Sequence, residues 1–225
     1  MLKNFLDVQP GDKIAFAGAG GKTTAIMKLA QELVNFKVLI ATTTKMYWEK
    51  EAVELTNSDE LSDLFAKQSI VITGKKIAQQ KMGSYDLNFL AKLTNFSDVT
   101  LIEADGAKRK PFKFPREYEP VYPDFVNKIV YVVGMNALNE PLMNLARGDL
   151  LQIFLAKKAE AKLTTDDIIK VLLSKQGAKK AVKDRDFYVI LNQVDTDFLA
   201  EQANIIAKTL MQHKIKVLLS SFEVK

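Results

Sequence analysis

The first residues that could do chemistry lie between positions 13 and 24, where a short apolar run meets a cluster of glycines followed by a lysine and two threonines. Glycines let backbone N–H groups approach an anion without a side chain in the way. The start of a helix adds further N–H donors and the positive end of its dipole. This order of residue types predicts a loop that binds the phosphates of a nucleotide, formed by Gly18, Ala19, Gly20, Gly21, Lys22, Thr23 and Thr24.

Two side chains of this predicted loop have specific roles in phosphoryl chemistry. Lys22 is expected to contact the β- and γ-phosphates and to stabilise charge as a catalytic residue, and the Thr23 hydroxyl is expected to bind Mg²⁺. Phe16 stands where the usual pattern has a further glycine, so the loop is a shortened variant of the kind that Mur-type ligases also show. The alternative interpretation is a glycine-rich turn between a strand and a helix, with no ligand.

Two acidic residues, Glu103 and Asp105, follow the apolar run 99–102. Mg²⁺ prefers oxygen ligands, and it usually retains several waters. Residues i and i+2 share a face of a strand. We therefore predict that Asp105 binds the metal together with Thr23, and that Glu103 and Asp105 are catalytic residues which hold Mg²⁺ or position a water. The alternative is a solvated acidic turn.

A second polar stretch ends a later apolar run and reads Asn192, Gln193, Val194, Asp195. It resembles the Asn-Lys-x-Asp pattern by which many GTPases recognise guanine, with Gln193 in place of the lysine. We therefore predict that Asn192 and Asp195 bind the nucleotide, and the pattern favours GTP over ATP without deciding between them. The alternative is a polar loop that follows a strand.

Several hydroxyl and basic side chains are candidates for a clamp on a phosphate or an anionic substrate. Thr42 to Lys45 follow the second apolar run, and basic residues follow Gly106. The predicted clamp consists of Thr43, Thr44, Lys45, Lys108, Arg109 and Arg147. The alternative is that these are ordinary β-branched and solvated loop residues.

These residues must be positioned by a regular alternation of strands and helices. Strands are expected over 13–17, 38–42, 69–74, 99–102, 129–134, 187–191 and 215–219, and helices over 3–8, from the glycine loop to about 35, from a cap at Ser58, and over 86–93, 142–156, 165–173 and 198–212. Residues 74–83 are expected to form a loop or ribbon, and 107–124 a proline-rich loop. The alternation predicts an α/β, three-layer P-loop NTPase-like fold, in one domain over 1–225, with a mostly parallel sheet covered by helices on both faces. In such a sheet, ligands bind beyond the carboxyl ends of the strands.

Composition excludes some classes of function and disfavours others. There is no cysteine, which excludes disulfides, thiolate metal sites and cysteine nucleophiles. Residues 1–7 lack the apolar core of a secretion signal, and no run is long enough to span a membrane, so we expect a cytoplasmic protein without a membrane partner. The net charge of +5 is explained by a phosphate-bearing ligand and does not favour nucleic acid as a partner.

The sequence resembles the YqeC family over nearly its whole length. The likeness is carried by the glycine loop 18–24, by Thr42 to Met46, by 103–113, by 119–123, by Val133-Gly134 and by Arg147. The most specific part is the acidic stretch at 103–106 with its basic, proline-containing tail. Members are described as accessory proteins of selenium-dependent molybdenum hydroxylases. The resemblance implies a P-loop fold and a partner that is a molybdenum hydroxylase or its cofactor.

Taken together, the residues predict a protein that binds a Mg²⁺–nucleoside triphosphate, ATP or GTP, and hydrolyses it slowly. The resemblance adds the maturation of a molybdenum enzyme as the purpose. Two alternatives stay open. One is a kinase or ATP-dependent ligase acting on an anionic small molecule held by Lys45, Lys108 and Arg109. The other is a scaffold that binds nucleotide without hydrolysing it.

Overall fold

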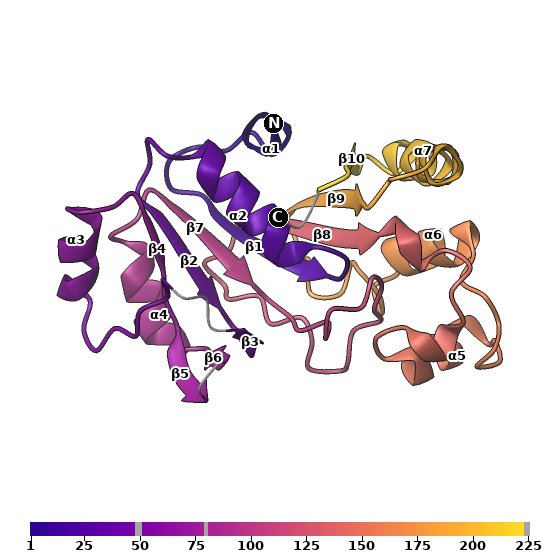
Figure 1. The fold of residues 1–225 in the computed structure, drawn as a ribbon, viewed down its shortest axis with the longest axis horizontal. Helices are drawn as coiled ribbons and strands as arrows, with labels where there is room; N and C mark the ends of the chain where they lie inside the picture. The colour runs from indigo at the N-terminus through magenta and orange to yellow at the C-terminus, as the bar shows by residue number, and fades with distance from the viewer. Residues whose placement is uncertain (48–50, 79–80, 223–225) are drawn as a thin grey trace. The chain divides into compact units, whose positions relative to one another are not determined.

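The structure is a computed structural model that describes residues 1–47, 51–78 and 81–222 of the chain. These residues form two compact units, whose chain course can be followed in Figure 1. Unit 1 consists of Met1–Phe16, Ala25–Gly106 and Val121–Lys128, and unit 2 of Ala17–Thr24, Ala107–Pro120 and Ile129–Lys225. The expectation of a single domain over 1–225 stays a prediction.

The main sheet has seven strands in the order β10-β9-β8-β1-β7-β2-β4. These are β1 (Lys13–Gly18), β2 (Val38–Thr42), β4 (Ile70–Ile72), β7 (Val99–Glu103), β8 (Lys128–Gly134), β9 (Asp186–Asn192) and β10 (Lys216–Leu219). Strand β1 runs parallel to β7, β7 to β2, β2 to β4, and β9 to β10. Helices flank the sheet, which confirms the predicted α/β class and agrees with a three-layer P-loop-like fold.

The strands form where the sequence has runs of apolar and β-branched residues. Every residue of β2, β7 and β8 is buried. A strand that is covered on both faces needs apolar side chains at consecutive positions rather than at alternate ones. This is why the sequence predicts these strands to within one residue at each end.

In unit 1, two helices pack on an apolar cluster beside β2 and β4. They are α3 (Asp59–Phe65) and α4 (Leu87–Thr94), and the cluster contains Leu39, Leu55, Leu61, Phe65, Val71 and Leu93. Asp86 caps the start of helix α4, and its carboxylate accepts from the N–H groups of Asn88 and Phe89. Ser58 occupies the N-cap position of α3, as predicted, but its side chain makes no capping hydrogen bond, and Asn57 Oδ1 accepts from the N–H groups of Asp59 and Glu60 instead.

Two further helices lie wholly or mostly in unit 1, and both are shorter than predicted. Helix α1 spans Leu2–Phe5, and α2 spans Lys22–Glu32, of which Ala25 onward belongs to this unit. The lysine-rich stretch after β4 is a ribbon, since β5 (Lys75–Ala78) and β6 (Lys81–Gly83) pair antiparallel with each other and β6 with β3 (Met46–Tyr47).

In unit 2, the prediction of one helix over 142–156 is wrong, because the segment is interrupted. A 3₁₀ turn, η2 (Leu142–Asn144), is separated from helix α5 (Gly148–Leu155) by Arg147, which has a left-handed backbone with φ of 61°. A Cβ at Gly148 would lie 2.1 Å from the Leu142 carbonyl oxygen, so this arrangement of the two segments requires glycine at position 148. The remaining elements of this unit are η1 (Met135–Ala137), α6 (Thr165–Leu173) and α7 (Asp197–Gln212). Thr164 caps α6 in a capping box with Asp167.

Candidate functional site

The glycine loop of unit 2 has the backbone that only glycine adopts readily. The φ angles of Gly18, Gly20 and Gly21 are +92°, +84° and +120°. Positive values of this kind are strained for residues with a Cβ. Helix α2 begins directly after them, at Lys22. The predicted order of strand, glycine loop and helix is therefore present at residues 13–32.

Neighbouring backbone and side-chain groups surround this loop closely. A Cβ at Gly18 would lie 2.3 Å from Val132 O, and one at Gly20 would lie 2.2 Å from Gly134 N. The N–H of Ala19 donates to Val132 O at 2.9 Å, which fixes the loop to β8. The three glycines are thus required by contacts as well as by backbone angles.

The side chain of Lys22 is buried within the glycine loop. Lys22 is only 5% exposed, and its Nζ donates to the Gly18 carbonyl oxygen at 2.7 Å. An ammonium group has three N–H donors in all. The contact of Lys22 with a phosphate stays a prediction, and the amine lies beside a carbonyl oxygen of the loop at the start of α2. Thr23 and Thr24 follow in the first turn of α2, and both are half-buried.

Asn192 holds the glycine loop to the end of β9. Its Nδ2 donates to Gly20 O at 2.8 Å, and its Oδ1 accepts from Ser220 Oγ at 3.0 Å and from the N–H of Phe222 at 2.9 Å. Because Asn192 is buried and its amide is engaged at both ends, the structure gives it a positioning role. Its predicted contact with a nucleotide base stays a prediction.

Gln193 and Asp195, which follow Asn192 in the same polar stretch, differ from each other in exposure. Gln193 has a left-handed backbone with φ of 61°, and its Oε1 is buried without a hydrogen-bond partner among the described residues. Asp195 is exposed and accepts a short hydrogen bond from the hydroxyl of Ser221. A base-binding role of Asp195 is likewise untested by the geometry.

In unit 1, the ends of three strands are brought level by the register of the sheet. Glu103 pairs with Phe16 of β1 and with Thr42 of β2. Glu103 is 6% exposed and Asp105 is 0% exposed, so the alternative of a solvated acidic turn does not fit. Thr42 is also buried, and its hydroxyl donates to the carbonyl oxygen of Glu103 at 3.0 Å.

The clamp residues of unit 1 lie beside these strand ends. The Thr43 hydroxyl donates to Val121 O at 2.8 Å, and its N–H donates to Glu103 O at 3.1 Å. Thr44 donates its N–H to the Thr42 hydroxyl at 3.0 Å and is half-buried, whereas Lys45 is exposed. The Thr43 hydroxyl is therefore engaged with a backbone carbonyl, and Lys45 lies at the surface.

The clamp residues of unit 2 fall into two environments. Lys108 and Arg109 are exposed and have left-handed backbones, with φ of 50° and 58°. Arg147 is almost buried, with its side chain 12% exposed, and its Nη2 donates to Glu119 Oε1 at 3.3 Å. The clamp role of all three stays a prediction, but only Arg147 has its charge inside the protein.

Arg147 belongs to a buried ion network that the sequence analysis missed. Lys113 has a fully buried side chain, and its Nζ donates to Glu119 Oε2 at 2.9 Å. The Arg116 N–H donates to the same oxygen at 3.3 Å. Burial raises the pKa of Glu119, but the hydrogen bond and charge of Lys113, with the Arg116 N–H and Arg147, outweigh it and hold that pKa below its ordinary value. Lys113 and Glu119 lie in stretches that carry the family resemblance, but nothing in the sequence indicated that they are buried and paired with each other.

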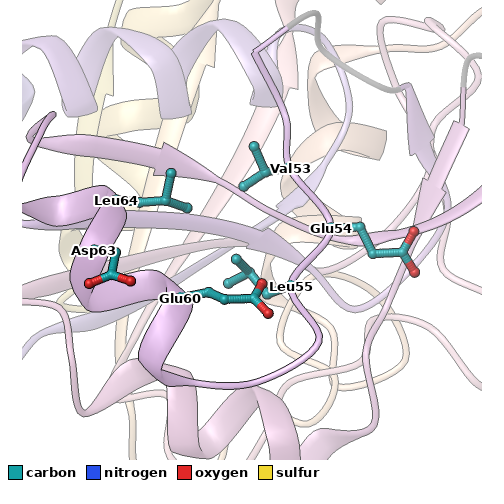
Figure 2. A pocket seen from close by; sticks show the side chains of 6 residues that line it. All are labelled: Val53, Glu54, Leu55, Glu60, Asp63 and Leu64. Atoms are coloured by element: carbon teal, nitrogen blue, oxygen red, sulfur yellow. The ribbon is translucent and has the colours of Figure 1, made fainter.

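A shallow pocket of about 300 Å³ lies elsewhere in unit 1 (Figure 2). Its walls are Val53, Glu54, Leu55, Glu60, Asp63 and Leu64. Three carboxylates line the pocket, but they do not point to a common centre (Figure 2). Glu60 accepts from the hydroxyl of Thr56 at 2.5 Å and from Asn57 Nδ2 at 2.8 Å, and Glu54 points away from α3 in Figure 2. The pocket contains no residue of the predicted site.

Two searches of the described residues bear on the class of site. Within them, no group of three or more His, Cys, Asp or Glu side chains is arranged to hold a metal ion. The predicted metal ligands, Thr23 and Asp105, are not a site of that type. Of the helices in the described segments, none has both the length and the apolar character needed to cross a membrane.

Comparison with known proteins agrees with the resemblance seen in the sequence. A model of the YqeC protein family matches residues 14–147, a segment that begins in β1, contains the glycine loop and the buried carboxylates, and ends at Arg147. A protein of Escherichia coli (strain K12) described as "Uncharacterized protein YqeC" is 29% identical over 184 residues, which cover 75% of this chain and 70% of that protein. Because the family match spans more than half of its length, the chain belongs to the YqeC family.

Proposed function

We propose that the glycine loop of this chain binds a Mg²⁺–nucleoside triphosphate, ATP or GTP. The observation that carries this proposal is the loop itself. Three glycines with positive φ lead into α2, and the amine of Lys22 lies buried at 2.7 Å from Gly18 O. Helix starts and nests of backbone N–H groups of this kind bind phosphate groups. The loop conformation requires its glycines, because a Cβ at Gly18, Gly20 or Gly21 would lie 2.3, 2.2 or 2.4 Å from a neighbouring atom.

The chemistry proposed for this loop is slow hydrolysis of the terminal phosphate. Lys22 would neutralise charge on the transferring phosphoryl group, and the Thr23 hydroxyl would bind Mg²⁺. Catalysis of phosphoryl transfer consists almost entirely of positioning and electrostatic stabilisation, so few additional groups are needed. The assignments of Asp105 as a metal ligand and of Glu103 as a catalytic residue are part of this proposal and rest on the sequence pattern, and both carboxylates are buried within unit 1.

We propose further that hydrolysis supports the maturation of a selenium-dependent molybdenum hydroxylase. Support for this step comes from membership of the family alone. A kinase or ligase acting on an anionic small molecule is the second candidate, and a specific observation favours it: Arg147 has an unsatisfied buried donor. Turnover that needs a second small substrate would favour the kinase or ligase. Turnover stimulated by a partner protein would favour the accessory role.

A thermal-shift experiment tests nucleotide binding. ATP, GTP, CTP and the corresponding diphosphates are compared with and without Mg²⁺. A triphosphate at 100 times its Kd should stabilise the folded chain by about 2.7 kcal/mol, which corresponds to a rise in Tm of about 5–11 °C for a chain of this size. Lys22→Ala should abolish the rise.

Lys28→Ala is the matched control, because it removes the same charge from an exposed position on the same helix. It should retain the full rise in Tm. The Tm of each variant without ligand shows that it is folded. If no triphosphate raises the Tm, or if Lys22→Ala responds like the wild type, the proposal is wrong.

A further inference from the structure

The guanidinium of Arg147 is only partly satisfied inside unit 2. Among the described residues, its side-chain hydrogen bond is the long contact of 3.3 Å from Nη2 to Glu119 Oε1. Its Nε is buried and has no partner among the described residues. The Nε–H and one Nη2–H lie side by side on one edge of a guanidinium, and this pair of parallel donors is the fork that binds carboxylates and phosphates. One donor of that fork is therefore without an acceptor.

Glu119 cannot supply the missing acceptor in its present position. Its second oxygen, Oε2, already accepts from Lys113 Nζ at 2.9 Å and from the Arg116 N–H at 3.3 Å. A buried N–H without an acceptor is costly, and more so when it belongs to a charged group. The carboxylate thus holds Arg147 through a single long bond from Nη2 and leaves Nε without an acceptor in the described part of the chain.

The backbone of Arg147 is held in place by contacts of the residues on both sides of it. Ala146, which precedes Arg147, exchanges hydrogen bonds with Phe112 and Phe114. Gly148, which follows it, is crowded by Leu142 O. Arg147 itself has the left-handed φ of 61°, which is strained for an arginine. Strained backbones persist where surrounding contacts fix them, and they concentrate at ligand-binding positions.

One short segment connects Arg147 to the glycine loop within the same unit. Pro111 O accepts from the Gly134 N–H at 2.9 Å, and it would lie 2.7 Å from a Cβ at Gly20. Two residues further along, Lys113 forms a parallel bridge with Ala146. Two residues of extended chain span about 7 Å. Segment 111–114 therefore contacts the glycine loop at one end and the neighbour of Arg147 at the other.

We propose that the Nε and Nη2 edge of Arg147 is a binding site for an oxyanion, namely a carboxylate or phosphate group of a ligand. Glu119 and Lys113 position the guanidinium, and the incoming oxyanion accepts from both donors of the fork. The oxyanion comes either from a second substrate or from the nucleotide. The proposal rests on the proposed function only for the identity of the ligand at the glycine loop.

Arginine Nε–H signals in ¹⁵N–¹H spectra test this site directly. The arginines of the chain are Arg109, Arg116, Arg147 and Arg185. The full chain is titrated with inorganic phosphate, and separately with acetate, at constant ionic strength with sodium chloride as the reference salt. The Nε–H signal of Arg147, assigned by its loss in Arg147→Lys, should move saturably, while the other three should move little. Equal, non-saturating movement of all of them overturns the proposal.

Affinity measurements on variants give a second readout. Arg147→Lys retains the charge beside Glu119 but lacks the fork, and it should bind the titrated anion about 10-fold to 100-fold more weakly, as expected for loss of a charge-assisted hydrogen bond. Arg116→Lys is the matched control, because Arg116 is an exposed arginine of the same segment that contributes only its backbone N–H to the network. It should bind within about twofold of the wild type. Equal affinity of wild type and Arg147→Lys would also overturn the proposal.

A further arm identifies the source of the oxyanion and keeps the two proposals separate. The titration is repeated with Lys22→Ala and with the triphosphate in place of phosphate. If the Arg147 signal moves only with triphosphate bound at an intact loop, the nucleotide supplies the oxyanion; if it moves with free anion in Lys22→Ala, a second ligand does. Should no nucleotide bind at all, the response of Arg147 to phosphate still decides the present proposal alone.

Discussion

Replacing Gly21 by alanine tests whether the shape of the glycine loop is set by its contact with Asn192. Gly21 has φ of +120°, and a Cβ there would lie 2.4 Å from Asn192 Nδ2. That distance is far below van der Waals contact, so Asn192 must move. Movement of Asn192 would break its hydrogen bond of 2.8 Å to Gly20 O. The substitution therefore destabilises the folded state in two ways: it forces alanine to a positive φ, and it makes a steric overlap with Asn192.

The two effects have separable magnitudes. Forcing an L-residue to a positive φ costs about 1–2 kcal/mol. The steric overlap adds about 1–3 kcal/mol. We therefore expect Gly21→Ala to lower the free energy of unfolding by about 2–5 kcal/mol. In an Asn192→Ala background the overlapping atom is gone, and the same substitution should lower it by only the φ cost, about 1–2 kcal/mol.

The assay is urea unfolding of the wild type, both single variants and the double variant, followed by circular dichroism with the m-values compared. Gly11→Ala is the matched control, because Gly11 has φ of +94° but nothing within 4 Å of an added Cβ. It should show the φ cost alone. The reasoning is refuted if the effects of Gly21→Ala and Asn192→Ala add to within about 0.5 kcal/mol, or if Gly21→Ala costs no more than Gly11→Ala.

Two further predictions concern polar groups outside the site. Burial raises the pKa of Asp167, but hydrogen bonds from Lys157 and Thr164 outweigh this effect and leave that pKa below its ordinary value. The ionised carboxylate therefore stabilises the folded state above pH 3.8, and this stabilisation is lost as the pH falls through the lowered pKa. Asp167→Asn should accordingly lower the urea midpoint at pH 7 and approach the wild type in acid; an equal difference at both pH values would contradict this. Tyr85→Phe should lower the free energy of unfolding by about 1–3 kcal/mol, because the buried Leu55 N–H would lose the Tyr85 hydroxyl as its acceptor. An unchanged urea midpoint would contradict this role of the hydroxyl.

The glycine loop could be predicted from the sequence because its requirements are local. Positive φ angles need glycine, and a helix that begins at Lys22 needs helix formers directly after it. The strands were predictable for a similar reason, since consecutive buried positions need consecutive apolar residues. In both cases the residue type at one position carries the constraint, and no knowledge of distant contacts is needed.

The interruption before α5 was not predicted, although the sequence contains a residue that indicates it. The apolar spacing of 142–156 is that of one helix, yet Arg147 leaves the helical region and Gly148 lies against Leu142 O. The glycine inside the pattern was the available signal, because glycine is unfavourable in a helix interior and marks close approach of another backbone. The ribbon formed by β3, β5 and β6 was left open because β5 is exposed along its whole length and has no apolar pattern.

Lys113 shows why the rest of the site could not be predicted. Lys108 and Lys110 lie a few residues before it in the same basic stretch and are exposed, whereas the side chain of Lys113 has no exposed area. The difference comes from tertiary pairing, because Lys113 bridges to Ala146 and so lies beneath neighbouring segments. A buried lysine is tolerated only with a counter-charge, which Glu119 supplies. Neither the burial nor the pairing is encoded at position 113, so the requirement for Glu119 follows only once residues 113 and 146 have been brought together.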